Sequence, residues 1–434
     1  MAEKKFEEDY MEIYADNFRG FKKQKISIDD VTFFVGENST GKSSILSALT
    51  ILQSLENDKE PNFQNGFSDL HFFSDATDND KNFKLGFSQT ENNGFKLFLY
   101  EFTSHKGKPI LFSVCFYYDG FIVYANKQGY GKKPALVIKK EDSEISFDTI
   151  NNDLEIFRSR YIDQSNLNEK EANIKIKSAG FLPMLMGTKF DFAETLRRDE
   201  HEFNEFAFRR NLPYMVWLAP IRAEAKRIYE DIETQFSPAG EHTPGMIKTL
   251  TDTKTKKNKI IDLVNKFGRD SDLFQEIEIK RYGVESDSPF QIMIKIDNKK
   301  VRITNTGYGV SQVLPIILEV LSRKEKTFFI LMQPEVHLHP KAQAALGELI
   351  ANLNDQENKK FIIETHSDYL INRYRITKRK NDFTNKSSVS FFYRNKDKNL
   401  NQKIEIDEKG KYSKDQPKEF RNFFIQEELR LLEI

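Results

Sequence analysis

The sequence has few of the features that define secreted, membrane or strongly charged proteins. It contains one cysteine, Cys115, in 434 residues, which excludes an internal disulfide bond and a cysteine-based metal site. No apolar run approaches the roughly 18 residues that a membrane helix needs, and the charged N-terminus lacks the apolar stretch of a signal peptide. Lysine plus arginine and aspartate plus glutamate both total 66, so no global basic charge indicates a nucleic-acid partner. We therefore expect a cytoplasmic protein with no membrane attachment.

One glycine-rich motif carries specific chemistry. Residues 36–43 read Gly-Glu-Asn-Ser-Thr-Gly-Lys-Ser, a complete G-x-x-x-x-G-K-[ST] phosphate-binding loop between a strand-like run and an apolar-periodic helix. In that setting the loop N–H groups surround the β-phosphate, Lys42 reaches the β- and γ-phosphates, and the Ser43 hydroxyl is a ligand of Mg²⁺. The sequence therefore predicts an ATP and Mg²⁺ site. Its expected residues are Asn38, Ser39, Thr40, Gly41, Lys42, Ser43 and Ser44, with Ser43 as the metal ligand.

The pattern of predicted elements divides the chain into three segments. Residues 1–55 hold the first part of an ATPase core, residues 56–210 form an insertion, and residues 211–434 hold the rest of the core. The insertion reads as β-rich and then helical. In the last segment strands and helices alternate, which predicts an α/β fold with a mainly parallel sheet, helices on both faces and an antiparallel β lobe. Expected strands lie at 11–15, 31–35, 83–87, 95–102, 110–118, 121–125, 214–219, 291–296, 327–332 and 361–365, expected helices at 45–55, 189–211, 311–322 and 340–353, and two strands and a helix follow in the tail.

Three further motifs indicate a second part of the site. Residues 305–312, Asn-Thr-Gly-Tyr-Gly-Val-Ser-Gln, precede a predicted helix and would present backbone N–H groups and a hydroxyl to an anion. Taken alone, this segment reads equally well as a glycine turn capped by Ser311. Apolar strands then end in Met-Gln-Pro-Glu-Val-His-Leu-His-Pro at 332–340 and in Thr-His-Ser at 365–367, at the sheet edge where ligands bind. The His-x-His pair at 337–339 would bind a metal only if further ligands converge, so we favour a loop that supports a dimer-facing turn.

Together the motifs resemble ATP-binding-cassette (ABC) ATPases of the branch that contains RecF, the structural-maintenance-of-chromosomes (SMC) heads and the OLD-like prokaryotic ATPases. The chain is most similar to the stand-alone AAA-labelled ATPases of anti-phage systems, such as the Septu and PARIS types. The matching segments are Asn17–Lys22, the phosphate loop, Trp217–Arg222, the signature-like Gly307–Gln312, the Walker B-like Met332–Pro340 and the switch Thr365–Ser367. They run in family order, whereas residues 56–210 show little resemblance.

The resemblance implies an ABC-ATPase head that works as a homodimer or a higher homo-oligomer. Two subunits would pack head-to-tail, and ATP on the phosphate loop of one would be clamped by the signature loop of the other. Residues implied in nucleotide binding are Arg19, Gly307, Gly309, Ser311 and Gln312, and residues implied in catalysis are Gln333, Glu335 and His366.

One departure from the family pattern affects hydrolysis. The family usually places an acid, followed by a second acid or a glutamine, where this chain has Met332 and Gln333. Methionine neither holds the water shell of Mg²⁺ nor orients the attacking water, and glutamine orients a water without taking its proton. Glu335 is the only carboxylate left in the block. We therefore expect an ATPase with slow hydrolysis, or ATP binding that serves as a switch.

Two functions from different classes remain open. The first is a dimeric nucleotide-dependent switch that senses or controls an effector nuclease, of the HNH or Toprim type, in prokaryotic anti-phage defence. The chain has no Toprim-like acidic cluster and no nuclease motif, so cutting would need a partner. The second is a RecF-like ATP-dependent DNA-binding clamp in repair, based on three basic clusters, although charge runs are usually solvated faces. These clusters are Lys254/Lys256/Lys257/Lys259, Lys299/Lys300/Arg302 and Arg373/Arg375/Lys378/Arg379/Lys380. A transporter nucleotide-binding domain ranks third, because the signature is not Leu-Ser-Gly-Gly-Gln.

Overall fold

The structure, a computed structural model, describes most of the chain and divides it into two compact units. The described residues are 10–421 and 423 without 58–60, 65–67, 78, 80, 92–93, 119–120, 127–134, 141–144, 158–174, 177–211, 231–232, 253–257, 286–287 and 422. Unit 1 comprises Met1–Ile28, Glu37–Pro213 and Phe392–Gln402, and unit 2 comprises Asp29–Gly36, Tyr214–Phe391 and Lys403–Ile434. The predicted helix at 189–211 and most of the first basic cluster lie outside the described residues.

Unit 1 is built on an eight-stranded sheet in the order β2-β1-β4-β5-β6-β7-β8-β9, and every neighbouring pair is antiparallel. Aromatic and β-branched residues dominate its strands, as pleated and half-buried surfaces favour. The strands are β1 (Tyr10–Asp16), β2 (Gln24–Ile28), β4 (Phe83–Glu91), β5 (Gly94–His105), β6 (Lys108–Tyr118), β7 (Phe121–Asn126), β8 (Ala135–Lys140) and β9 (Lys175–Ile176), and the helices are α1 (Lys42–Asn57), η1 (Phe73–Asp75) and α2 (Phe147–Phe157). The sequence predicted β1, β4 to β7 and α1, but not β2, β8, β9 or α2.

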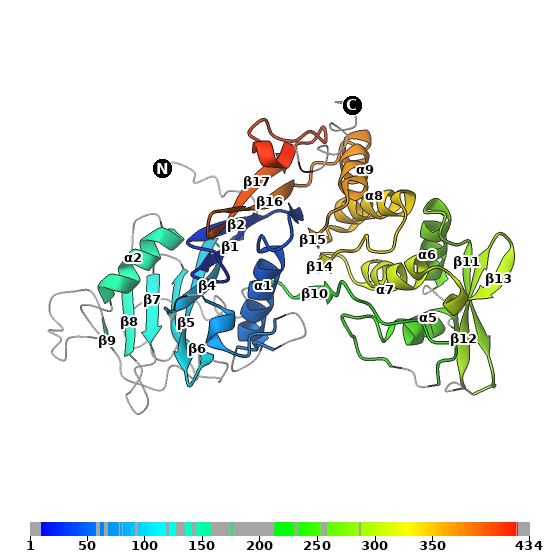
Figure 1. The fold of residues 1–434 in the computed structure, drawn as a ribbon, viewed down its shortest axis with the longest axis horizontal. Coiled ribbons are helices and arrows are strands. Elements are labelled where there is room, and N and C mark those ends of the chain that lie inside the picture. The colour runs from blue at the N-terminus through cyan, green and yellow to red at the C-terminus, as the bar shows by residue number, and fades with distance from the viewer. Residues whose placement is uncertain are drawn as a thin grey trace. The chain divides into compact units, whose positions relative to one another are not determined.

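Helix α2 covers one face of this sheet (Figure 1). The Tyr14 ring stacks on Phe147 with 4.6 Å between ring centroids, and the Tyr14 hydroxyl accepts a hydrogen bond from Asn151 Nδ2 at 2.7 Å. Cys115 is buried in the same apolar cluster and is in no disulfide bond. The insertion predicted from the sequence therefore contributes most of a layered β unit.

Unit 2 contains most of a six-stranded sheet in the order β10-β14-β15-β3-β16-β17. The pairs β10–β14, β14–β15 and β15–β3 are parallel, and their apolar strands are almost wholly buried. The elements are β3 (Val31–Gly36), β10 (Met215–Leu218), β14 (Phe328–Met332), β15 (Lys360–Glu364), β16 (Ser387–Asn395) and β17 (Lys398–Ile406), with α7 (Tyr308–Ser322), α8 (Pro340–Glu357) and α9 (Asp368–Lys380). This parallel α/β core was predicted from the strand and helix alternation, apart from α9.

A second part of unit 2 consists of two helices and a small antiparallel sheet. The sheet has the order β11-β12-β13, and α5 and α6 pack with each other, with α7 and with β11 (Figure 1). Of these elements only β12 was predicted. The bounds are α5 (Thr243–Asp252), α6 (Asn258–Asp270), β11 (Glu276–Arg281), β12 (Phe290–Ile296), β13 (Lys299–Arg302) and η4 (Ile303–Asn305).

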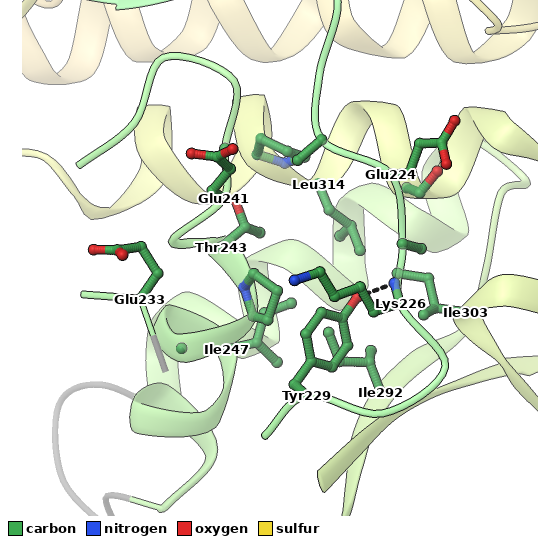
Figure 2. A pocket seen from close by; sticks show the side chains of 17 residues that line it. Glu224, Lys226, Tyr229, Glu233, Glu241, Thr243, Ile247, Ile292, Ile303 and Leu314 are labelled. Carbon is green, nitrogen blue, oxygen red and sulfur yellow. Dashed lines mark hydrogen bonds between the residues drawn. The ribbon is translucent and has the colours of Figure 1, made fainter. Parts of the chain in front are cut away.

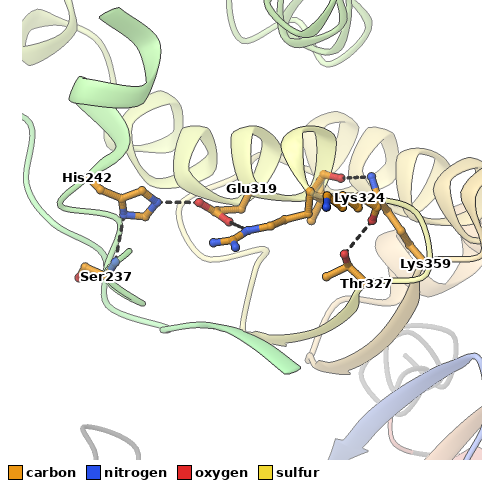
Figure 3. Close-up of polar contacts among 8 residues, drawn as sticks. Ser237, His242, Glu319, Lys324, Thr327 and Lys359 are labelled. Atoms are coloured by element: carbon orange, nitrogen blue, oxygen red, sulfur yellow. Dashed lines mark hydrogen bonds and ion pairs between the residues drawn. The ribbon is translucent and has the colours of Figure 1, made fainter. Parts of the chain in front are cut away.

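A buried polar network fixes α7 near its C-terminal end (Figure 3). Nδ1 of His242 accepts the Ser237 N–H at 3.1 Å, so Nε2 carries the ring proton and donates it to Glu319 Oε1 at 2.6 Å. Arg323 Nε donates to Glu319 Oε2 at 2.6 Å. Burial alone would raise the pKa of the Glu319 carboxyl, but the hydrogen bonds from His242 and Arg323 outweigh it and leave that pKa below its ordinary value.

No helix in the described part of the chain is both long enough and apolar enough to cross a bilayer.

Candidate nucleotide site

The phosphate-binding loop joins the end of β3 to the start of α1 and is shaped by its own polar contacts. Lys42 Nζ donates to the Glu37 carbonyl at 2.7 Å, and the Thr40 hydroxyl donates to the same carbonyl at 2.8 Å. Ser39 and Gly41 adopt positive φ angles of 63° and 98°. The loop is therefore already closed around its lysine. Lys42 and Thr40 are buried, whereas Asn38, Ser39 and Ser43 are exposed and Ser44 is half-buried.

Gly41, the second glycine of the phosphate-loop motif, is needed for packing as well as for backbone conformation. A Cβ atom on Gly41 would lie 2.4 Å from Cζ of the Phe21 ring. The segment that carries Phe21 is fixed by Asn399, which donates from Nδ2 to the Arg19 carbonyl at 2.9 Å and from its backbone N–H to the Gly20 carbonyl at 3.0 Å. The segment at 17–22 therefore supports the phosphate loop inside unit 1.

Arg19, a predicted nucleotide contact, lies in that supporting segment with φ of 44°. Its backbone N–H donates to the Ala76 carbonyl at 2.7 Å and its Nε donates to the Asp75 carbonyl at 3.1 Å. Burial lowers the pKa of its guanidinium, against the charges of Asp75 and Asp69. The side chain is thus anchored from Nε, and its contact with nucleotide stays a prediction.

The residues of the loop suit ATP and Mg²⁺. Exposed Ser43 lies in the first turn of α1, where a hydroxyl serves as one metal ligand beside nucleotide oxygens and water. Within the described residues no group of three or more His, Cys, Asp or Glu side chains is arranged to hold a metal ion. The donor set therefore fits a metal bound through the nucleotide better than one bound by a protein cage.

The predicted catalytic residues come together in unit 2. β14 and β15 are parallel neighbours with Met332 opposite Glu364, so their C-terminal ends meet at one sheet edge. Just past those ends, the Gln333 N–H donates to the Glu364 carbonyl at 2.8 Å, and Glu335 Oε1 accepts the backbone N–H of His366 at 2.7 Å. Gln333 has φ of 44°, a left-handed conformation that turns the chain sharply after the strand.

Glu335, one of the predicted catalytic residues, has one carboxylate oxygen bonded and the other shielded. Its Oε2 is shielded from solvent and accepts no hydrogen bond from any described residue. Burial raises the pKa of this carboxyl, although the hydrogen bonds from the His366 and Glu335 backbone and from Thr365, and the charge of Arg222, act in the opposite direction. A carboxylate with a raised pKa and a free acceptor oxygen is suited to take a proton from a positioned water.

Arg222 links this cluster to α7, the helix that begins at the signature-like segment, a role that the sequence did not predict. Its Nη2 donates to the carbonyls of Met332 and Gln333 at 3.2 and 3.3 Å, and its own carbonyl accepts Gln312 Nε2 at 3.4 Å. Burial lowers the pKa of Arg222 to about 10, against the charge of Glu335. Nε and Nη1 are buried without a partner among the described residues. The available sequence signal was the match at 217–222, where Ala219, Pro220 and Ile221 separate the arginine from the end of the apolar strand β10.

The signature-like turn forms the start of α7. Gly307 is the N-cap residue, and no side chain caps the helix. By contrast, His339 and Ser367 accept backbone N–H groups at the starts of α8 and α9. The Ser311 hydroxyl donates to the Tyr308 carbonyl of its own helix at 3.0 Å. The first N–H groups of α7 therefore donate to no capping side chain, although the Val310 N–H donates to the Gly307 carbonyl at 3.2 Å.

Gly307 and Gly309 of this turn differ in how much space a side chain would have. A Cβ atom on Gly309 would lie 2.7 Å from the His337 carbonyl oxygen, so close packing against the Walker B-like loop requires glycine. Among the described residues, no atom lies within 4 Å of a Cβ atom placed on Gly307, and its φ of −61° is open to any residue. The described part of the chain therefore gives no reason for glycine at 307.

One histidine of the Walker B-like block contacts this turn, and the other caps the helix that follows the block. The His337 ring lies 5.7 Å from the Tyr308 ring, and His339 caps α8 through Nδ1. Tyr308 is 64 % exposed. This arrangement agrees with a loop that supports the turn, which was the favoured interpretation of the His-x-His pair.

A phosphate loop on a mainly parallel α/β core, followed by strand ends that carry polar motifs, is the arrangement of a P-loop ATPase domain. Residues 31–372 match the family described as "AAA domain, putative AbiEii toxin, Type IV TA system", and the chain belongs to that family. No curated protein sequence matches the chain.

Solved SMC heads are similar to this chain in structure at low sequence identity. The SMC head domain of Thermotoga maritima has a TM-score of 0.40 at 12% identity, over 92% of this chain and 99% of that one. An SMC head bound to the C-terminal winged-helix domain of ScpA has a TM-score of 0.41 at 11% identity, over 92% and 98%. The Pyrococcus furiosus head with an extended coiled coil, bound to the C-terminal domain of ScpA, has a TM-score of 0.37 at 12% identity, over 98% and 100%.

Proposed function

We propose that this ATPase is a cytoplasmic, dimeric nucleotide-dependent switch that controls an effector nuclease in prokaryotic anti-phage defence. ATP bound with Mg²⁺ at the phosphate loop of one subunit is clamped by the signature turn of another. The two subunits therefore associate in one geometry with ATP and in another with ADP. We assign the nuclease activity to a partner protein, since residues 1–434 show no nuclease motif.

The observation that carries the proposal is the open start of α7. Its N-terminal N–H groups have no capping side chain, and Gly307 leaves clear space above them. A helix N-terminus with free N–H groups attracts phosphate oxygens. A glycine that the subunit itself does not need is explained when another molecule must approach the backbone at that point.

The proposed ATP hydrolysis is slow. Met332 supplies no carboxylate for the water shell of Mg²⁺, and Gln333 takes no proton. Glu335 and His366 meet at the same sheet edge, so Glu335 is the candidate base and His366 the candidate contact to the γ-phosphate. A slow ATPase holds the ATP-bound assembly for a long time, which suits a switch.

Light scattering with ATP, ADP or no nucleotide tests the dimer. We expect a larger assembly with ATP than with ADP for the natural protein, and none for Gly307→Arg, whose side chain fills the open space while ATP binding persists. Val284→Arg is the matched control, because it adds the same charge at a residue of unit 2 that is 97 % exposed. The proposal fails if Gly307→Arg assembles with ATP as the natural protein does.

Phage plating tests the biological role. Cells that carry the gene with its neighbours should resist phage, and the Lys42→Ala gene should not protect. Equal protection by both genes would exclude a role for nucleotide binding in defence.

The described basic residues do not favour the DNA-clamp alternative. Lys300 Nζ lies 2.6 Å from Glu278 Oε2, and Arg373 Nη1 lies 3.0 Å from Glu348 Oε2. Arg375 Nε donates to the Gly410 carbonyl at 2.8 Å. Lys300 and Arg373 are thus paired with carboxylates, which lowers the local positive charge that a phosphate backbone would meet, whereas Arg375 keeps its charge and is held by a carbonyl.

A further inference from the structure

Unit 2 contains a cavity of about 680 Å³ beside the signature helix (Figure 2). Part of its wall is the start of α7, where Ser311, Leu314 and Pro315 face it. No residue of the phosphate loop, the Walker B-like block or the switch segment lines it. The cavity is thus separate from the predicted catalytic residues, but it touches the helix that carries the signature turn.

The inner wall combines apolar side chains with two acceptor atoms. Ile247 and Leu314 are among the apolar residues that line it. Thr243 is only 6% exposed, and its Oγ1 has no hydrogen-bond partner among the described residues. Pro315 has no N–H, so the Ser311 carbonyl lacks the donor that the fourth residue along a helix normally supplies. Thr243 and Ser311 both line the cavity, so these two oxygens are the acceptors that we assign to a bound donor group.

The mouth of the cavity carries an excess of negative charge. Exposed Glu224, Glu233 and Glu241 line it together with one cation, Lys226 (Figure 2). Glu233 Oε1 accepts the Gln235 N–H at 2.9 Å. Over the residues that the structure describes, none of these four groups forms an ion pair with another. One lysine leaves two of the three carboxylates uncompensated.

The start of α5, which also borders the cavity, offers little to an anion. The Thr243 N–H donates to the Gly240 carbonyl at 3.0 Å, Pro244 has no N–H, and the Met246 N–H donates to the His242 carbonyl at 3.0 Å. Of the first four residues of α5, only Gly245 has a backbone N–H that could donate to an anion in the cavity. Acceptors therefore outnumber donors around the cavity.

We propose that this cavity binds an organic cation, an alkylammonium or guanidinium group on an apolar stem. The charged head donates to Thr243 Oγ1 and the Ser311 carbonyl and is attracted by the carboxylates, since hydrogen bonds with one charged partner are about twice as strong as neutral ones. The stem packs on Ile247 and Leu314. Because Ser311 belongs to the signature turn, an occupant stabilises the start of α7. The site does not depend on the proposed ATP switch.

Calorimetric titration of the full chain without nucleotide tests the site with three probes of equal length. These are 1,5-diaminopentane, its neutral analogue 1,5-pentanediol, and the anion glutarate. We expect saturable binding of the diamine only. Combined Glu224→Gln, Glu233→Gln and Glu241→Gln should weaken it by roughly tenfold, and Thr243→Val should weaken it roughly threefold. The matched control changes net charge equally at exposed Glu285, Glu325 and Glu408, each to Gln, and should bind the diamine as the natural protein does.

Two further probes distinguish the sources of such a cation. Tighter binding of spermidine than of N-acetyl-arginine amide identifies a free polyamine as the occupant, and the reverse order identifies a protein side chain. The proposal is overturned if the diamine does not saturate, if the diol or glutarate binds equally well, or if the cavity and control variants lose affinity to the same extent.

Discussion

The two helices that begin at predicted nucleotide contacts, α1 in unit 1 and α7 in unit 2, begin in opposite ways. α1 follows a loop that is closed by its own side chains, because Lys42 and Thr40 both donate to the Glu37 carbonyl. α7 begins at Gly307 with no capping side chain and open space around it. The first start is complete within the chain. The start of α7 lacks a capping side chain and has a glycine without near neighbours, and a phosphate group from another molecule would explain both features.

This difference separates the two tasks of the site. A preformed loop binds nucleotide with little rearrangement, and Lys42 exchanges one oxygen acceptor for another when phosphate arrives. An uncapped helix start costs stability in the free subunit, and a bound phosphate restores the missing partners. Variants in the phosphate loop at the start of α1 should therefore affect nucleotide binding. Variants at the start of α7, or at the C-terminal ends of β14 and β15, should affect assembly and ATP hydrolysis.

Lys42→Ala gives the largest expected effect at the α1 end. Removing the ammonium should weaken ATP binding by about 100-fold or more, because charge-assisted bonds to phosphate are lost. Titration with a fluorescent ATP analogue measures this, with exposed Lys409→Ala as the control. Unchanged affinity would refute the phosphate-loop assignment.

Glu335→Gln should remove about 100-fold of whatever turnover the natural protein has, if Glu335 is the base. Because burial raises the pKa of Glu335, turnover should fall on acidification at a higher pH than an ordinary carboxylate would give. Phosphate release measured across pH for both proteins decides this. Brisk turnover that survives Glu335→Gln would show that the catalytic block works differently.

Arg222→Met should lower turnover by about tenfold and leave ATP binding unchanged. Methionine keeps much of the volume but loses the bonds to Met332 and Gln333, so the strand end and the signature helix are no longer joined. Arg222→Lys should restore less than half of the lost rate, since one ammonium does not reproduce a guanidinium fork. Equal effects on nucleotide affinity and turnover would indicate general misfolding instead.

Met332→Asp should raise turnover by roughly fivefold, if the missing Walker B acid limits hydrolysis. The new carboxylate would stand at the C-terminal edge of β14, where the family places its acid. Met332→Asn, which has the same shape without the charge, is the control. A gain with both variants would point to repacking, and no gain with either would mean that another step limits the rate.

Most of the parallel core was predictable because its strands are continuous apolar runs that end in polar motifs. Val31–Gly36, Phe328–Met332 and Lys360–Glu364 all form parallel strands of one sheet. Elements such as β11 and β13 were missed because they are short and contain more charged than apolar residues. In Glu276–Arg281 only two of the residues are apolar. Helix α9 was missed because it is rich in lysine and arginine along much of its surface.

The motif residues of the site were predictable, but their supports were not. Gln333, Glu335 and His366 meet because two strand ends are neighbours, which the alternation of elements implies. The contact of Phe21 with Gly41 depends on a long-range approach that no local pattern encodes. Arg222 is more than 100 residues away from the carbonyls that it binds, as the separations of 110 and 111 show.

The smallest expected effect concerns how α7 is held in place without a cap. Its C-terminal part is fixed through Glu319, which accepts from His242 and Arg323, and Glu319→Gln should lower the free energy of unfolding by about 2 kcal/mol at pH 7. The folded pKa of Glu319 lies below its ordinary value, so its stabilisation is complete above the unfolded pKa and is lost as pH falls through the folded pKa. Urea unfolding at pH 7 should therefore separate the natural protein from Glu319→Gln, and the difference should shrink below about pH 4. Exposed Glu325→Gln should match the natural protein at both pH values. A difference that stays constant with pH would mean that Glu319 contributes through packing and not through its charge.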